Sequence, residues 1–119
     1  MFKIFSSSKP KTTALDIGKT AELKAAKFLR KNGLKILEQN FHSRFGEIDI
    51  IAEDDEILHF VEVKASEKYD ALARITPSKM EKIVKTIEYY MMKNDSEKDF
   101  QIDALVLEGG KIEWIKNIN

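Results

Sequence analysis

Two carboxylates and one lysine stand where a sheet protein usually has apolar residues. Asp49 interrupts the run IDIIA, Glu62 interrupts the run ILHFVEV, and Lys64 follows two residues later. Removing a carboxylate from water is unfavourable by several kcal/mol unless a partner compensates it. Two neighbouring carboxylates are usually relieved by a shared proton or by a bound cation. We therefore expect Asp49 and Glu62 to hold Mg²⁺ or Mn²⁺, and Lys64 to orient water and stabilise charge on a phosphate.

The elements that carry these three residues are two adjacent strands joined by an acidic turn. The predicted strands are Gly46–Glu53 and Ile57–Lys64. Because side chains alternate along a strand, Ile48 and Ile50 should share one face and Asp49 the other. By the same rule Glu62 and Lys64 should share a face, within a sheet that is covered on both sides. The alternative is a structural ion pair between Lys64 and one of the acids.

Two helices should cover the sheet. The first is expected over Asp16–Gly33, with Glu22 at the margin of its buried stripe, where it either faces the sheet or is solvated. The second should begin at Thr76, which can cap it, with Pro77 in its first turn. Lys79 lies at the edge of the buried face of that helix. It can lean toward the hairpin or extend into water.

Three more strands complete the expected sheet. They are predicted over residues 34–41, 100–107 and 111–118, the last two joined by a Gly-Gly turn. Residues 65–76 are expected to form a connecting loop, in which Tyr69 and Arg74 can contact nucleic acid.

Four other polar or aromatic residues need an interpretation. Asp103 interrupts an apolar strand and is a further candidate for a buried acid. His42 and His59 have no partner at metal-ligand spacing, so we interpret them as surface or sheet residues. Trp114, the only tryptophan, is interpreted as a packing residue.

Composition limits the class of protein. With 119 residues, 43 % hydrophobic and 34 % charged, the chain should form one folded domain over residues 16–119, after a flexible basic arm over residues 1–15. The absence of cysteine excludes disulfides, a thiol nucleophile and cysteine-ligated metal centres. No apolar run reaches the length of a membrane span, so no membrane partner is expected and a cytoplasmic location is the default.

The net charge of zero hides an uneven distribution. Residues 1–33 carry eight basic and two acidic side chains, whereas residues 34–64 carry three basic and eight acidic ones. Basic helices around an acidic centre are typical of a protein that binds a polyanion and holds a cation. The alternative is a set of solvated, lysine-rich helix faces.

Segments spread over most of the chain carry a family resemblance. They are GKTAELKAAKFL from Gly18, GLKILEQN from Gly33, GEIDIIA from Gly46, FVEVK from Phe60, TPSK from Thr76, and Asp103 with the closing WIKNI. With these segments the chain resembles the uncharacterised YraN-like family (UPF0102-type). That family is similar to archaeal Holliday junction resolvases in the PD-(D/E)XK, restriction-endonuclease-like superfamily.

The resemblance implies an α/β fold with an αβββαβ core, a mixed central sheet and helices on both faces. It also implies metal-dependent hydrolysis of phosphodiester bonds. By position, Asp49 and Glu62 would be the metal ligands and Lys64 the catalytic lysine, and Glu22 would be the acid that a helix adds to the site. Resolvase-like nucleases often work as dimers, so a homodimer is compatible with the resemblance.

Three functions are consistent with the sequence. The leading one is a magnesium-dependent endonuclease acting on DNA, including branched or structured DNA, with contacts from four basic residues: Lys19, Arg74, Lys79 and Lys82. The second is a nucleic-acid-binding module of the same fold without turnover. The third is an interaction protein whose acidic cluster is structural.

Overall fold

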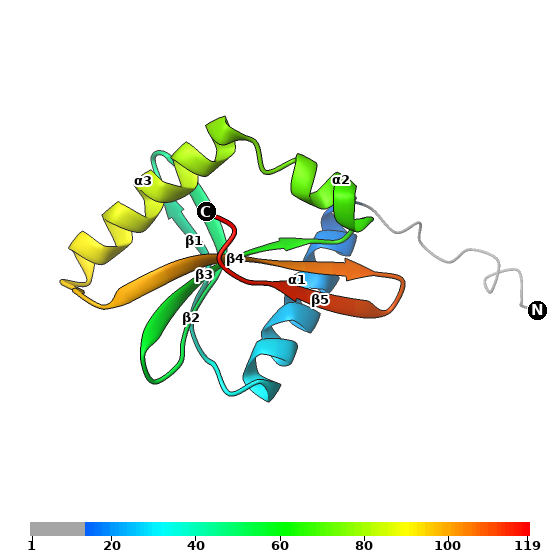
Figure 1. Cartoon of the computed structure of the whole chain (residues 1–119), viewed down its shortest axis with the longest axis horizontal. Helices are drawn as coiled ribbons and strands as arrows, with labels where there is room; N and C mark the ends of the chain where they lie inside the picture. The colour runs from blue at the N-terminus through cyan, green and yellow to red at the C-terminus, as the bar shows by residue number, and fades with distance from the viewer. Residues whose placement is uncertain (1–13) are drawn as a thin grey trace, which may run out of the picture.

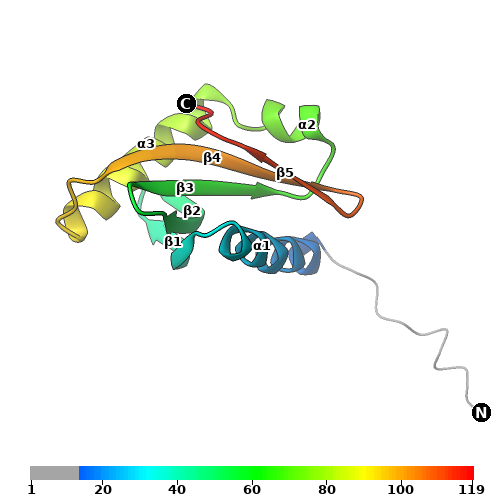
Figure 2. The same cartoon turned by 60° about the horizontal axis from the view of Figure 1, so that its bottom comes forward.

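The computed structural model describes residues 14–119. In chain order the elements are α1 (Ala14–Lys31), β1 (Lys35–Ser43), β2 (Gly46–Glu53), β3 (Ile57–Lys64), α2 (Lys68–Ala73), α3 (Pro77–Lys93), β4 (Asp99–Glu108) and β5 (Lys111–Ile115). The five strands form one sheet, with α1 on one side and α2 and α3 on the other (Figures 1 and 2). This is the expected α/β class, and its element order contains the αβββαβ core.

The sheet is mixed. Its strand order is β1-β2-β3-β4-β5, and only the β3–β4 pair is parallel. Parallel neighbours require a crossover connection, which α2 and α3 provide. The carboxyl ends of β3 and β4 therefore lie at the same end of the sheet, with Lys64 beside Val106.

Each face of the sheet packs against one long helix. The cluster on the α3 side contains Phe41, Ile48, Ile51, Leu58, Phe60, Ile83, Ile87, Tyr90 and Ile102. The cluster on the α1 side contains Ala25, Ala26, Leu29, Leu34, Ile50, Ala52, Val61 and Leu105. Phe60 and Val61 lie on opposite sides, so β3 alternates as its sequence predicts.

Strand β2 does not alternate regularly, and the expectation that Ile48 and Ile50 share a face is wrong. Ile48 packs on the α3 side and Ile50 on the α1 side. The reversal occurs at Asp49, which the register places opposite Asn40 of β1. Asn40 has a left-handed backbone, with φ of 54°. A residue in this conformation interrupts the pleat, and asparagine adopts it more readily than most residues do.

The helix starts follow the expected signals. The Thr76 hydroxyl accepts a hydrogen bond from the Lys79 N–H at 3.2 Å, and Pro77 occupies the first turn of α3. Helix α1 begins at Ala14, two residues before the expected start. Of the expected arm over residues 1–15, residues 1–13 lie outside the described part of the chain. No helix within residues 14–119 is long and apolar enough to cross a membrane.

The expected loop over residues 65–76 contains the short helix α2, which the sequence interpretation missed. The Glu67 carboxylate caps this helix by accepting hydrogen bonds from the N–H groups of Tyr69 and Asp70, at 2.6 and 3.4 Å. Ala71, on the inner side of α2, is fully buried.

The last strand is shorter than expected. Strand β5 ends at Ile115 rather than Ile118, because Asn117 adopts a left-handed backbone with φ of 56° and its N–H donates to Asp103 Oδ1 at 2.9 Å. The chain then returns to the sheet, where the Ile118 N–H donates to the Ile102 carbonyl at 2.8 Å.

Candidate active site

The candidate site lies where β2 separates from β3. The two strands pair from Glu53–Leu58 to Ile50–Val61, and no pairing continues beyond that point. Instead, Asp49 Oδ2 accepts a hydrogen bond from the Val63 N–H at 2.8 Å. A carboxylate oxygen therefore takes the place of the backbone carbonyl that a regular ladder would supply.

Glu62 is the most deeply buried acid of this site. Its side chain is only 3 % exposed, and Oε1 lies 3.6 Å from Lys79 Nζ. Oε2 is buried and has no hydrogen-bond partner. Buried carboxylate oxygens are normally satisfied, and an unsatisfied one is costly. An oxygen left in this state is suited to an additional cation or donor.

The two carboxylates influence each other. Burial, followed by the neighbouring Asp49 carboxylate, raises the pKa of Glu62 to about 7. Burial also raises the pKa of Asp49, against the lowering effects of the Val63 N–H, Lys64 and Lys79. Near neutral pH the pair therefore takes up a proton readily, and a divalent cation could replace that proton.

Two lysines complete the charge distribution. Lys64 lies two residues after Glu62 on the same strand, and its charge lowers the pKa of both carboxylates. Lys79 reaches the site from the first turn of α3 and remains 38 % exposed. Both ammonium groups lie within electrostatic reach of the carboxylates and can also attract a phosphate.

Helix α1 brings Glu22 to the edge of the same site. Burial and the Asp49 carboxylate raise the pKa of Glu22, whereas a side-chain hydrogen bond from Asn40 lowers it. Of the two alternatives, Glu22 therefore faces the sheet rather than bulk water. Asn40 positions it, a role that the sequence interpretation missed although an asparagine within a strand is unusual enough to be a signal.

The donor set suits a weakly coordinated hard cation. Among residues 14–119, no three histidine, cysteine, aspartate or glutamate groups are close enough together to form a metal cluster. Mg²⁺ is commonly held by only one or two carboxylates, with water and substrate oxygens as its other ligands. Asp49 and the free oxygen of Glu62 are compatible with that pattern.

The other expected nucleic-acid contacts are dispersed. Lys82 lies one turn beyond Lys79 on α3, and exposed Lys19 lies on α1, across the sheet. Arg74 follows α2, where its guanidinium donates to Ser66 Oγ at 2.7 Å and lies 3.4 Å from Asp70. Only Lys79 and Lys82 are therefore brought together, on the helix that faces Glu62.

A second buried acid belongs to a separate structural network. Asp103 accepts four hydrogen bonds, from His59 Nδ1 at 2.7 Å, Trp114 Nε1 at 3.0 Å, Gln101 Nε2 at 2.8 Å and the Asn117 N–H at 2.9 Å. His59 Nε2 also lies 2.9 Å from Asp54 Oδ2. His59 is a sheet residue as expected, but it has two acidic partners. Trp114 packs edge-on against Phe28, as expected of a packing residue.

The two carboxylates favour the positively charged form of His59. A neutral imidazole donates through one nitrogen only, whereas both nitrogens of His59 face carboxylates. Hydrogen bonds and charges from Asp103 and Asp54 raise the pKa of His59 against the effect of burial. In turn, the hydrogen bonds to Asp103 hold its pKa below the ordinary value despite burial. With four donors already bound, Asp103 has little capacity left for a metal.

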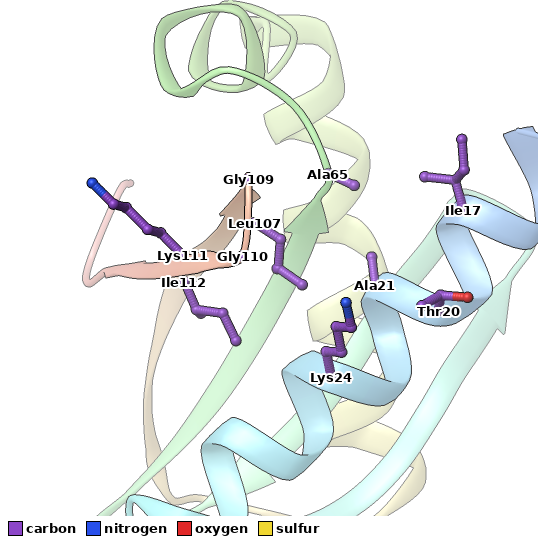
Figure 3. A pocket seen from close by; sticks show the side chains of 10 residues that line it. All are labelled: Ile17, Thr20, Ala21, Lys24, Ala65, Leu107, Gly109, Gly110, Lys111 and Ile112. Atoms are coloured by element: carbon purple, nitrogen blue, oxygen red, sulfur yellow. The ribbon is translucent and has the colours of Figure 1, made fainter.

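A hollow of about 380 Å³ lies beside the carboxyl end of β3 (Figure 3). It is bounded by the first half of α1 and by the turn between β4 and β5. Ala65, the residue after Lys64, contributes to its wall, but none of the carboxylates of the candidate site does. The hollow is therefore a neighbour of the site and not part of it.

The mixed five-stranded sheet and the αβββαβ order of the elements are those of a restriction-endonuclease-like α/β fold. More specifically, the chain belongs to the Uncharacterised protein family UPF0102, whose sequence profile matches residues 21–107. The matched range includes the candidate site from Glu22 to Lys79.

Relatives of similar length support the family assignment. A UPF0102 protein of a Nitratiruptor species is 54 % identical over 102 residues, which cover 86 % of this chain and 91 % of the relative. A UPF0102 protein of Campylobacter hominis is 56 % identical over 96 residues, covering 80 % and 86 %. One from Campylobacter jejuni subsp. jejuni (strain 81-176) is 52 % identical over 103 residues, covering 86 % and 92 %.

Proposed function

We propose that this protein is a metal-dependent nuclease that hydrolyses phosphodiester bonds in DNA, in the cytoplasm. One observation carries the proposal: Glu62 Oε2 is buried, has no hydrogen-bond partner and lies in a site shared with a second, half-buried carboxylate, that of Asp49. A purely structural ion pair would be expected to satisfy both oxygens of the buried acid, as the four hydrogen bonds of Asp103 do.

Asp49 and Glu62 are the residues that would hold Mg²⁺ or Mn²⁺. When bound, such an ion supplies positive charge to a phosphate oxygen and makes water more acidic. Asp49 is held in place by its hydrogen bond from Val63, and Glu62 by the packing of β3. A carboxylate that is held in place in this way favours a precise site.

The lysines supply the remaining electrostatics. In phosphodiester hydrolysis a water oxygen bonds to phosphorus, a phosphorus–oxygen bond to a sugar breaks, and that sugar oxygen takes up a proton. Negative charge increases on the phosphate during this exchange, and Lys64, on β3, would stabilise it. Lys79 offsets the charge of Glu62 at 3.6 Å and can help to attract the DNA backbone.

Titration calorimetry with Mg²⁺ and Mn²⁺ tests the proposed metal site. Wild type should bind, and both Asp49→Asn and Glu62→Gln should weaken binding by at least tenfold, because each removes one charged ligand. Asp103→Asn is not a suitable control, because it disturbs the His59 network. Glu88→Gln, on the exposed face of α3, is the matched control and should bind as wild type does. Absence of binding by wild type would overturn the proposal.

A second candidate function is nucleic-acid binding without turnover. It is favoured by the lysines of α3, of which Lys79 lies beside Glu62, because they could bind phosphate without a metal. Binding that weakens steeply with salt, with no cleavage in Mg²⁺ or Mn²⁺, would favour this alternative.

A further inference from the structure

We propose that the β1–β2 turn and helix α3 form a phosphate clamp for the DNA strand next to the candidate site. The clamp consists of Arg44, Phe45, Lys82 and Lys85. The inference rests on the proposed function in taking DNA as the ligand, but it does not depend on cleavage. Of these residues, only Lys82 is suggested as a nucleic-acid contact by the sequence alone.

The turn is fixed against α3 by one side-chain hydrogen bond and is braced internally by another. Ser43 Oγ and the buried Thr86 Oγ1 lie 2.9 Å apart, and the Phe45 N–H donates to Ser43 Oγ at 3.1 Å. Gly46 faces the same helix: a side chain there would meet the Lys82 Cβ at 3.7 Å. The turn therefore has a defined position relative to the lysines of α3.

Two cations from different elements converge on the Phe45 ring. The Arg44 guanidinium carbon lies 4.9 Å from the ring centroid, and Lys85 Nζ lies 5.7 Å from it. An aromatic face attracts cations at these distances and restricts where they lie. The Phe45 ring thus contacts both members of this cation pair, and phosphate is a suitable ligand for a guanidinium or an ammonium group at this turn.

The lysines of α3 connect this cation pair to the candidate site. Lys79, Lys82 and Lys85 follow at intervals of three residues, and Lys79 contacts Glu62. At 1.5 Å per residue the row is about 9 Å long. Successive phosphates of one duplex strand rise about 3.4 Å along the axis and also turn around it, so a row of this length reaches about two neighbouring phosphates. A strand with one phosphate at the carboxylates would place its neighbours along the row.

Acidic groups close to the clamp do not block it. Glu81 lies 3.5 Å from Lys85 as an exposed pair one helical turn apart, and Glu47 lies 3.2 Å from His42 next to the turn. Exposed ion pairs of this kind contribute little to stability, so a phosphate can displace Glu81 from Lys85. Since cations contact phosphates rather than base edges, the clamp should recognise the backbone without sequence preference.

The test is DNA binding in EDTA, where hydrolysis cannot interfere, with a fluorescent duplex carrying a single-stranded arm and a salt series. Arg44→Gln and Lys85→Gln should each weaken binding at low salt by roughly fivefold and reduce the slope of log affinity against log salt by about one. Phe45→Leu keeps both charges, so it should weaken affinity with a smaller change in slope.

Lys93→Gln is the matched control. Lys93 is on α3, like Lys85, but at the end of the helix remote from Lys79, Lys82 and Lys85. Its Nζ also lies near an aromatic ring, 5.7 Å from the centroid of Phe41 on β1. Its variant should bind as wild type does. Arg44 and Lys85 are exposed, so their variants should fold even if Phe45→Leu does not.

Three outcomes would overturn the clamp: no DNA binding by wild type, unchanged binding by Arg44→Gln and Lys85→Gln, or an equal loss in Lys93→Gln. Failure of the proposed nuclease is a different result. In that case the salt series would behave as predicted, while Mg²⁺ binding and cleavage would be absent.

Discussion

Asp49 accepts a hydrogen bond from the Val63 backbone N–H at 2.8 Å, at the point where β2 leaves β3. This contact gives Asp49 two roles. It replaces a missing hydrogen bond of the sheet, and it fixes a carboxylate beside Glu62. The separation of the strands and the placement of the acid therefore have the same structural origin.

The two roles of Asp49 can be separated by substitution. Asp49→Asn keeps an oxygen acceptor for the Val63 N–H, whereas Asp49→Ala leaves that donor unsatisfied in a part-buried position. We expect Asp49→Ala to lose about 1–2 kcal/mol of unfolding free energy relative to Asp49→Asn in EDTA. Urea denaturation measures the difference. Equal stability of the two variants would show that the hydrogen bond does not support the fold.

Removing the charge of Glu62 should stabilise the metal-free protein at alkaline pH. The folded state raises the pKa of this acid from 4.5 to about 7, so its stabilising contribution decreases as pH rises through that interval. At pH 8, Glu62→Gln should gain on the order of 2–3 kcal/mol in EDTA. Thermal unfolding with Glu88→Gln as control tests this, and a destabilised Glu62→Gln would contradict it.

Mg²⁺ should offset most of that difference in stability. A ligand at a hundred times its dissociation constant stabilises the folded state by about 2.7 kcal/mol. Wild type should gain this amount in unfolding free energy as Mg²⁺ is added, whereas Glu62→Gln should gain much less. If the two proteins shift in parallel, the ion is bound elsewhere.

The His59 network predicts a second pH dependence. The pKa of His59 is raised in the folded state. Its contribution to the unfolding free energy is therefore complete below about pH 6.5 and is lost as pH rises through the pKa of the folded state. The pKa of Asp103 is lowered in the folded state. Its contribution to the unfolding free energy is therefore present above about pH 4 and is lost on acidification. Between these limits, breaking the buried pair by His59→Ala should remove about 3–5 kcal/mol of unfolding free energy.

Denaturation of Glu62→Gln between pH 6 and pH 9 isolates the His59 contribution. That variant should still lose stability as pH rises, whereas Glu62→Gln combined with His59→Ala should lose much less. A similar decline in both proteins would show that His59 is not charged in the folded state.

Asn40 should be sensitive to backbone and side-chain changes in different ways. Its φ of 54° suits glycine, so Asn40→Gly should retain most of the stability, whereas Asn40→Ala should lose about 1 kcal/mol more. Both variants lose the hydrogen bond to Glu22 and should raise the pKa of that acid further. Urea denaturation and NMR titration of Glu22 measure the two effects.

Much of the fold follows from local patterns in the sequence. Thr76 and Pro77 mark the start of α3, and alternation in Ile57–Lys64 places Phe60 and Glu62 on one side of the sheet. The same rule fails in β2, because a left-handed residue on the neighbouring strand changes the pleat. Periodicity within β2 contains no information about Asn40.

Other contacts could not be predicted from the sequence because they join residues that are far apart in the chain. His59 lies 44 residues before Asp103, and only the parallel register of β3 and β4, set across α2 and α3, brings them together. Likewise, the contact of Ser43 with Thr86 joins residues 43 positions apart. Single residues can indicate a buried acid or a turn, but the partners depend on how the crossover packs.

The central claim is tested most directly by cleavage of a panel of labelled DNA structures, including duplexes, single strands and four-way junctions, with and without Mg²⁺ or Mn²⁺. We predict metal-dependent cleavage of at least one substrate by wild type, loss of at least a hundredfold in rate in Lys64→Ala, and a normal rate in Lys93→Gln. No cleavage of any substrate by folded wild-type protein, or an equal rate in Lys64→Ala, would contradict the proposed nuclease.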